Sequence, residues 1–131
     1  MPISDDYVAQ FLLQETSSHP ATLIWSHHEG EQYKTHVNGV GVELCVITGR
    51  AGPRLFLTIS ASPERIEIYE PMQTGMFRGK YSTEADARLA ELLRRLANAV
   101  ARQCAQRLNR TEEALDTVRE SIYRRLTGMG V

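Results

Sequence analysis

The chain is poor in the features that mark secreted, redox-active and membrane proteins. It has only two cysteines, Cys45 and Cys104, and neither lies in a CxxC or Cys/His spacing. Reduced, buried thiols are therefore favoured, with a bridge between the two left open. No apolar run approaches the roughly 18 residues of a membrane span. The opening residues MPISDDYVAQFLLQ carry acids where a secretory leader needs bases, so we expect a cytoplasmic protein without a membrane segment.

An excess of charge of one sign is also absent. The 131 residues have a net charge of -1, with 42% hydrophobic and 24% charged residues. This composition is typical of an ordinary globular protein, and its bulk charge does not favour nucleic acid or an anionic membrane. The length suits one compact domain over residues 1–131.

Residues 4–16 are predicted to form an amphipathic helix, with Ser4 or Asp5 as its N-cap. Its apolar side chains recur at helical spacing: Tyr7, Val8, Phe11 and Leu12. Pro20 disfavours a helical conformation in the residue before it and so ends this segment.

Residues 22–70 switch to alternating polar and apolar side chains, interrupted by turn signals. This pattern predicts five antiparallel strands in a meander. Asn38-Gly39 is the most specific signal, because both residues suit the positive φ angles of a type I′ hairpin turn. A turn there places Val37 opposite Val40 and sets the register of the sheet.

Extending this register gives the sheet two different faces. One face is apolar and is the predicted core: Tyr33, Thr35, Val42, Leu44, Leu57, Ile59, Ile66 and Ile68. The other is polar with an aromatic centre: Gln32, Lys34, Glu43, Cys45, Phe56, Thr58, Glu67 and Tyr69. In the first strand a three-residue loop around Gly30 buries Trp25, whereas a two-residue loop exposes it beside Lys34; we favour the buried tryptophan.

After a linker over residues 71–82, a long helix is predicted over 83–108, with Thr83 as N-cap. Asn109 and Thr111 suit the end of one helix and the start of another, which predicts a shorter helix over 111–127. The fold class is therefore α+β: an N-terminal helix, a five-stranded antiparallel sheet, and a long and a shorter C-terminal helix packed mainly on one sheet face.

The long helix predicts an oligomer. A helix of about 25 residues spans roughly 37 Å, more than the roughly 20 Å of the strands it should cover. Part of its apolar stripe must then find another partner. A stripe of alanines beside it allows close approach of a second helix, so we expect a homo-oligomer joined through the helices.

The segment before the long helix suggests an anion site. A P-loop has four residues between its two glycines and Ser or Thr after its lysine. Here only three residues separate Gly75 from Gly79, and Tyr81 follows Lys80, so the segment does not match. Arg78 and Lys80, with Thr83 at the helix start, form a weaker candidate for a phosphorylated, nucleotide-like small molecule. The alternative interpretation is a solvated linker.

The aromatic centre of the polar sheet face is the candidate for a protein partner. Phe56 and Tyr69 lie there inside a charged rim, as in a protein interface. The rim consists of Lys34, Glu43, Arg54, Arg65 and Glu67. The alternative is that the first helix or a second subunit covers this face.

Other chemistry is less well supported. The four histidines, His19, His27, His28 and His36, lack metal-ligand spacing, and neighbouring strand residues point to opposite faces. Glu43 and Glu67 share a face at roughly 10 Å, without a nucleophile or oxyanion hole to complete a catalytic set. The helical arginines stand one turn from acids, which is typical of a solvated helix surface and argues against nucleic-acid binding.

The sequence thus predicts a small non-catalytic binding or adaptor protein, homo-oligomeric and engaging a protein partner, with no metal or other cofactor. The alternative is a protein that binds or sequesters a phosphorylated small ligand at Arg78, Lys80 and Thr83.

Overall fold

The computed structural model describes residues 3–18, 20–30, 32–49, 52–73 and 81–128. Two helices flank five strands along the chain: α1 (Asp5–Ser17), β1 (Ser26–His27), β2 (Gln32–Val37), β3 (Val40–Gly49), β4 (Gly52–Ala61), β5 (Glu64–Tyr69) and α2 (Glu84–Thr127). The strands form one antiparallel sheet in the order β1-β2-β3-β4-β5. The predicted α+β class and the five-stranded antiparallel meander are confirmed.

The hairpin turn sets the register as predicted. Asn38 and Gly39 have φ angles of 50° and 77°, and Val37 lies opposite Val40. From there the side-chain rows continue across the sheet, with Leu44 opposite Leu57 and Leu57 opposite Ile68. Because side chains alternate along a strand, this register sends one apolar set to a single face.

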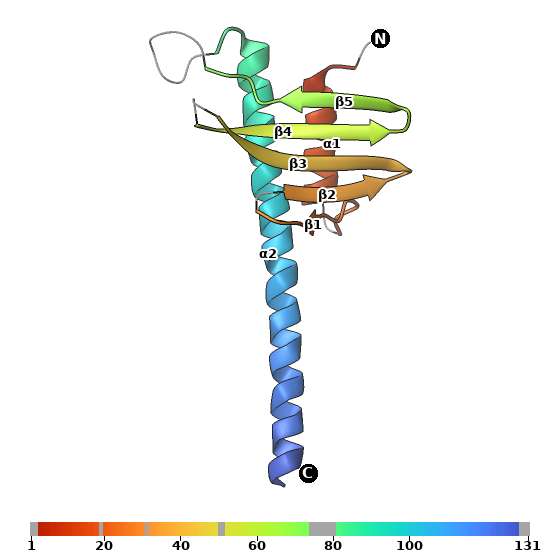
Figure 1. The fold of residues 1–131 in the computed structure, drawn as a ribbon, viewed down its shortest axis with the longest axis vertical. Helices are drawn as coiled ribbons and strands as arrows, with labels where there is room; N and C mark the ends of the chain where they lie inside the picture. Colours follow the sequence, from red (N-terminus) through yellow and green to blue (C-terminus); the bar gives the residue numbers. More distant parts are fainter. Residues whose placement is uncertain (1–2, 19, 31, 50–51, 74–80, 129–131) are drawn as a thin grey trace.

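That apolar face packs against both helices, which lie on the same side of the sheet (Figure 1). The buried cluster joins residues of the sheet, of the segment before β1 and of the two helices: Ala9, Leu12, Leu23, Trp25, Val42, Leu44, Leu57, Ile68, Leu89, Leu92, Leu93, Leu96 and Val100. The first helix therefore lies behind the sheet and does not cover its polar face.

Helix α1 begins as predicted, but only Val8 and Leu12 of its predicted apolar stripe face the core. The amide of Tyr7 donates to the Ser4 hydroxyl at 3.4 Å, which makes Ser4 the N-cap. Ala9, Leu12 and Thr16 are buried, whereas Tyr7 remains 70% exposed. Ala9 and Leu12 belong to the core cluster that includes residues of α2, and Val8 and Leu13 pack against it.

Trp25 is fully buried, which confirms the favoured position of this side chain. Its indole Nε1 donates to the Thr16 hydroxyl at 2.9 Å, and its backbone amide donates to the Gln103 side chain at 2.8 Å. Its carbonyl accepts from the Arg107 guanidinium at 2.8 Å. The residue thus ties the start of β1 to α1 and α2 together.

The C-terminal helices are not two but one, which corrects the prediction. Helix α2 runs for 44 residues, starting at the predicted N-cap Thr83 and ending at Gly128, whose φ is 69°. Thr111 does not cap a second helix: its hydroxyl donates to the carbonyl of Arg107 at 3.0 Å, within a continuous helix. A threonine can either cap a helix or bond backward inside one, and the local preference is worth only about 1 kcal/mol. The flanking helix-forming residues decide in favour of continuity.

A charged contact fixes the upper part of α2 to the sheet edge. Glu70 continues the β4–β5 pairing, because its amide donates to the carbonyl of Leu55 at 2.8 Å. Its buried carboxylate accepts from Arg94 of α2 at 2.8 Å. Hydrogen bonding to Glu70 raises the pKa of Arg94, so this guanidinium stays charged. Within the described residues, no helix combines the length and apolarity needed to cross a membrane.

Candidate functional site

The predicted partner patch lies on the polar face of the sheet, opposite the helices (Figure 1). The register places Phe56 opposite Tyr69 and Cys45 opposite Phe56. The two aromatic rings pack with centroids 4.6 Å apart, and the Arg54 guanidinium lies 5.1 Å from the Tyr69 centroid. In the part of the chain that the structure describes, no helix lies over this patch, so its centre is open to a partner.

The charged rim is arranged in pairs. Arg65 lies 3.2 Å from Glu67, which also accepts a hydrogen bond from the Tyr69 hydroxyl at 3.3 Å. On the other side Lys34 lies opposite Glu43 in the register, and Glu43 accepts a hydrogen bond from the Gln32 amide. Such exposed pairs contribute little to stability and leave their polar atoms available for exchange with a partner.

The titratable groups of the patch are poor nucleophiles. Burial, the charge of Glu67 and a hydrogen bond to it raise the pKa of the Tyr69 phenol. Burial and the charge of Glu43 raise the pKa of the Cys45 thiol. Both groups are therefore neutral at neutral pH, whereas a catalytic nucleophile needs a lowered pKa or an adjacent base.

The two carboxylates on this face serve different neighbours. Glu43 accepts from Gln32, and Glu67 accepts from Tyr69 and pairs with Arg65. Thr58 lies between them in the register and is itself buried. The arrangement holds the two acids apart on separate strands and does not direct both at one point.

The proposed anion site is described only in part. Thr83 accepts a hydrogen bond from the amide of Asp86 at 3.1 Å and so caps α2. The first turn of α2 carries two acids, Glu84 and Asp86, which oppose a bound anion. Arg78 and Lys80 lie outside the described residues, so the phosphorylated-ligand hypothesis stays a prediction.

The histidines do not converge. The ring of His27 stacks on Tyr33 with centroids 4.8 Å apart, and one of its nitrogens lies 2.6 Å from the carbonyl oxygen of Gly30. His36 lies near Gly41 on the polar sheet face, and His19 is outside the described residues. No group of three or more His, Cys, Asp or Glu residues suited to a metal ion occurs among the residues that are described.

The largest departure from the prediction is the lower part of α2. Residues 105–127, here called the arm, extend far beyond the sheet as a single helix (Figure 1). Large apolar side chains of the arm are half exposed or more: Leu108 (60%), Leu115 (51%), Val118 (54%), Ile122 (52%) and Leu126 (81%). The arm therefore presents an apolar face without a covering element in the described chain.

The polar side of the arm carries ion pairs between residues one turn apart. Arg124 lies 2.6 Å from Glu120, as the spacing predicts, and Arg119 lies 3.5 Å from Asp116. Arg88, nearer the start of α2, pairs with Asp6 of α1 at 3.9 Å. The Arg124–Glu120 pair matches the solvated helix surface that the sequence indicates, whereas Arg88 pairs with α1 instead of the expected Glu84. The expectation on nucleic acid stays a prediction.

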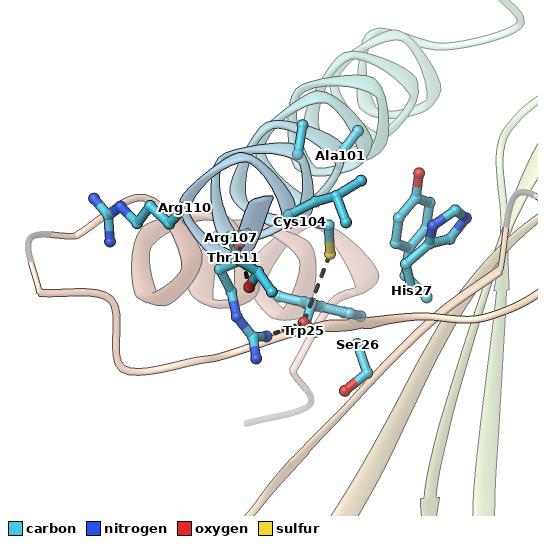
Figure 2. Close-up of a pocket in the computed structure, with 11 residues that line it drawn as sticks. Trp25, Ser26, His27, Ala101, Cys104, Arg107, Arg110 and Thr111 are labelled. Carbon is cyan, nitrogen blue, oxygen red and sulfur yellow. Dashed lines mark hydrogen bonds between the residues drawn. The ribbon is translucent and has the colours of Figure 1, made fainter. Parts of the chain in front are cut away.

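Where the arm leaves the sheet, it forms a notch with the segment around β1 (Figure 2). The notch has a volume of about 840 Å³. One wall is α2, with Ala101, Cys104, Leu108 and Thr111; the other includes Trp25 and Tyr33. Figure 2 shows Cys104 and Arg107 directed at Trp25, whose carbonyl they contact.

Sequence reasoning missed the notch because its two walls are about 80 residues apart in the chain. The apolar residues of the arm form a stripe in the sequence, but Asn109 and Thr111 favour a break between two helices. A test for an uninterrupted repeat across that break would have detected the arm. Cys104 and Cys45 are free, on α2 and on the polar sheet face respectively.

Comparisons with protein-family models, curated proteins and solved structures found no match to this chain. The polar sheet face, the arm and the notch are the surfaces of the described chain that suit a binding role.

Proposed function

We propose that this chain is a non-catalytic cytoplasmic binding protein, an adaptor that assembles into a homo-oligomer through its arm and engages a protein partner. The observation that carries the proposal is the row of exposed large apolar side chains on the arm. An isolated helix gains little stability from propensity alone and depends on packing of its apolar face. A helix with such an apolar stripe typically packs the stripe against another part of a protein, here a second helix.

The size of the apolar face supports assembly. Fully burying a leucine, valine or isoleucine side chain contributes about 1.5–3 kcal/mol, so burying the exposed half of each would contribute roughly 1 kcal/mol. Several such side chains on each protomer form the apolar centre of an interface, and the Arg124–Glu120 pair on the other side of the arm remains in water.

The polar sheet face supports engagement of a partner. Phe56 and Tyr69 offer a paired aromatic centre, and Arg54 lies over it. Aromatic and arginine side chains are enriched where partners bind most strongly. The raised pKa values of Cys45 and Tyr69 favour contact over catalysis.

Light scattering across a range of protein concentrations tests the assembly. We expect the wild-type chain to be larger than a monomer and Val118→Glu to dissociate at least about 100-fold more readily, because two buried carboxylates each weaken the interface by more than about 1.4 kcal/mol.

Thr117→Glu is the matched control, since it adds the same charge one residue away on the polar side of the arm. It should assemble like the wild type. A wild-type chain that stays monomeric at high concentration would reject the proposal, and so would equal effects of the two substitutions.

A further inference from the structure

A continuous line of residues, here called the seam, runs along α2 from Ala101, just before the arm, to the end of the arm. Apolar and small residues recur there at alternating intervals of three and four: Ala101, Cys104, Leu108, Thr111, Leu115, Val118, Ile122 and, with arginine at the last place, Arg125. This is the heptad spacing of helices that pack along their length. The first four of these residues line the notch, so the notch is the upper end of the seam.

We propose that a second copy of this chain occupies the seam in antiparallel orientation, with the last turns of its arm seated in the notch. This inference rests on the proposed assembly through the arm and adds its orientation, its register and the place where the second copy meets the fold, beside Tyr33.

The dimensions of the notch suit a helix end. A helix about 10 Å across rises about 5.4 Å per turn and so fills roughly 420 Å³ per turn. The notch, at about 840 Å³, has room for two turns. From Ala101 to Arg125 the seam is roughly 36 Å long, so an antiparallel copy centred on it brings its own final turns to the level of Ala101.

The side chains along the seam complement one another in this orientation. When the full length of the seam is engaged, each small residue meets a large one: Ala101 faces Arg125 of the second copy, Cys104 faces Ile122, Leu108 faces Val118, and Thr111 faces Leu115. Alternation of large and small side chains across a helix pair fills the space between them. The long stem of Arg125 can lie over Ala101 with its charge in water.

A parallel pair lacks this complementarity. It would oppose like residues, so that Ala101, Cys104 and Thr111 would each meet a side chain as small as themselves and leave gaps. It would also bring two Arg125 side chains together. In addition, a parallel pair places both sheets at the same level on a seam only about 10 Å across, whereas an antiparallel pair separates them by the arm.

The charges beside the seam agree with the antiparallel arrangement. Glu112 and Arg119 flank it on the same side, seven residues apart. In an antiparallel pair this side faces its own counterpart. Helical side chains lean toward the N-terminus, which brings Glu112 of one copy toward Arg119 of the other, twice across the two-fold axis. Arg119 then exchanges its exposed contact with Asp116 for one with Glu112.

Cys104 makes the orientation testable by oxidative cross-linking of the full chain. In the Cys45→Ser chain, Cys104 should not link to its counterpart, because antiparallel arms hold the two residues roughly 27 Å apart along the axis. Adding Ile122→Cys should yield at least about tenfold more covalent dimer, since a bridge needs Cα atoms within about 7 Å. Peptide mapping should then join position 104 to position 122.

Two further variants serve as control and as independent test. The chain with Cys45→Ser, Cys104→Ser and Ile122→Cys should give no covalent dimer, because its two thiols are again distant. The chain with Cys45→Ser, Cys104→Ser and Ala114→Cys should be joined by a short bismaleimide, because Ala114 lies beside the two-fold axis. Ala114 is small and exposed, so replacing it by cysteine should leave assembly intact. This variant therefore still tests the orientation if Ile122→Cys weakens assembly.

The outcomes separate the inference from the proposed function. Efficient linking in the Cys45→Ser chain, and again in the chain whose one thiol comes from Ile122→Cys, would show parallel arms and overturn the inference while the assembly stands. A dimer that none of these pairs links, or an arm bound by another protein or a small molecule in the notch, would also overturn it. A monomer at every concentration would overturn both.

Discussion

Replacing Thr16 by valine removes the hydrogen-bond acceptor of a buried tryptophan and keeps the shape of the side chain. Thr16 is 5% exposed and Trp25 is fully buried, with the indole nitrogen 2.9 Å from the Thr16 oxygen. The indole N–H is a donor only, so it has no partner once the hydroxyl is gone. Leaving a buried donor unsatisfied costs about 1–3 kcal/mol, and we expect Thr16→Val to lower the free energy of unfolding by this amount.

Urea denaturation followed by far-ultraviolet circular dichroism measures the effect, at one protein concentration for all variants. In a chain of this length the loss corresponds to a fall in melting temperature of roughly 3–5 °C per kcal/mol. Thr117→Val is the matched control, because the Thr117 hydroxyl also donates to a helical carbonyl, at 3.0 Å, but is exposed and serves no tryptophan. It should change stability by less than about 0.5 kcal/mol.

A double-mutant cycle isolates the hydrogen bond from packing. Trp25→Phe removes the donor, so adding Thr16→Val to it should cost little or nothing. The coupling between the two sites should then equal the cost of the orphaned donor, about 1–3 kcal/mol. If Thr16→Val costs the same with tryptophan or phenylalanine at position 25, the reasoning is refuted.

Three further predictions concern other parts of the molecule. Gly39→Ala should destabilise the fold by about 1–2 kcal/mol in the same urea assay, because its φ of 77° is unfavourable for a residue with a Cβ atom; an unchanged midpoint would contradict the tight turn. Glu70→Gln should lower the free energy of unfolding by about 1 kcal/mol, because it weakens the contact to Arg94, and the exposure of Arg94 limits the strength of this pair. If the loss is as large in a chain that already carries Arg94→Met, the pairing is contradicted. Ellman's reagent should modify Cys45 and Cys104 more slowly than free cysteine at mildly alkaline pH, because burial raises both pKa values above the ordinary 9.0 and lowers the thiolate fraction. The reaction rates should still be rising with pH beyond that value. Reaction as fast as that of free cysteine would contradict this.

The sheet was predictable because its signals are local. Alternation along each strand separates two faces, and Asn38-Gly39 pins one hairpin so that every later row follows. The side-chain rows therefore place Phe56 beside Tyr69 without knowledge of the rest of the fold. What alternation does not reveal is whether the first helix covers the polar face or joins α2 on the apolar one.

The course of α2 was harder to predict. The choice at Thr111 between a cap and a backward hydrogen bond depends on differences of about 1 kcal/mol, which a local pattern does not resolve. The consequence is large, because a break there would fold the last segment back, whereas continuity projects an apolar arm beyond the sheet (Figure 1).

By itself the sequence determined the strands, the register of the last four, the two unlike faces of the sheet and the capped start of α2 at Thr83, since each follows from neighbours a few residues apart. It left Ser4 and Asp5 as alternative caps of α1. The tertiary structure decided that α1 joins α2 on the apolar face (Figure 1), how α1 is rotated, and that Trp25 meets Arg107 across 82 residues to form the notch. Contacts between segments so far apart depend on how whole elements pack, and no local periodicity records them.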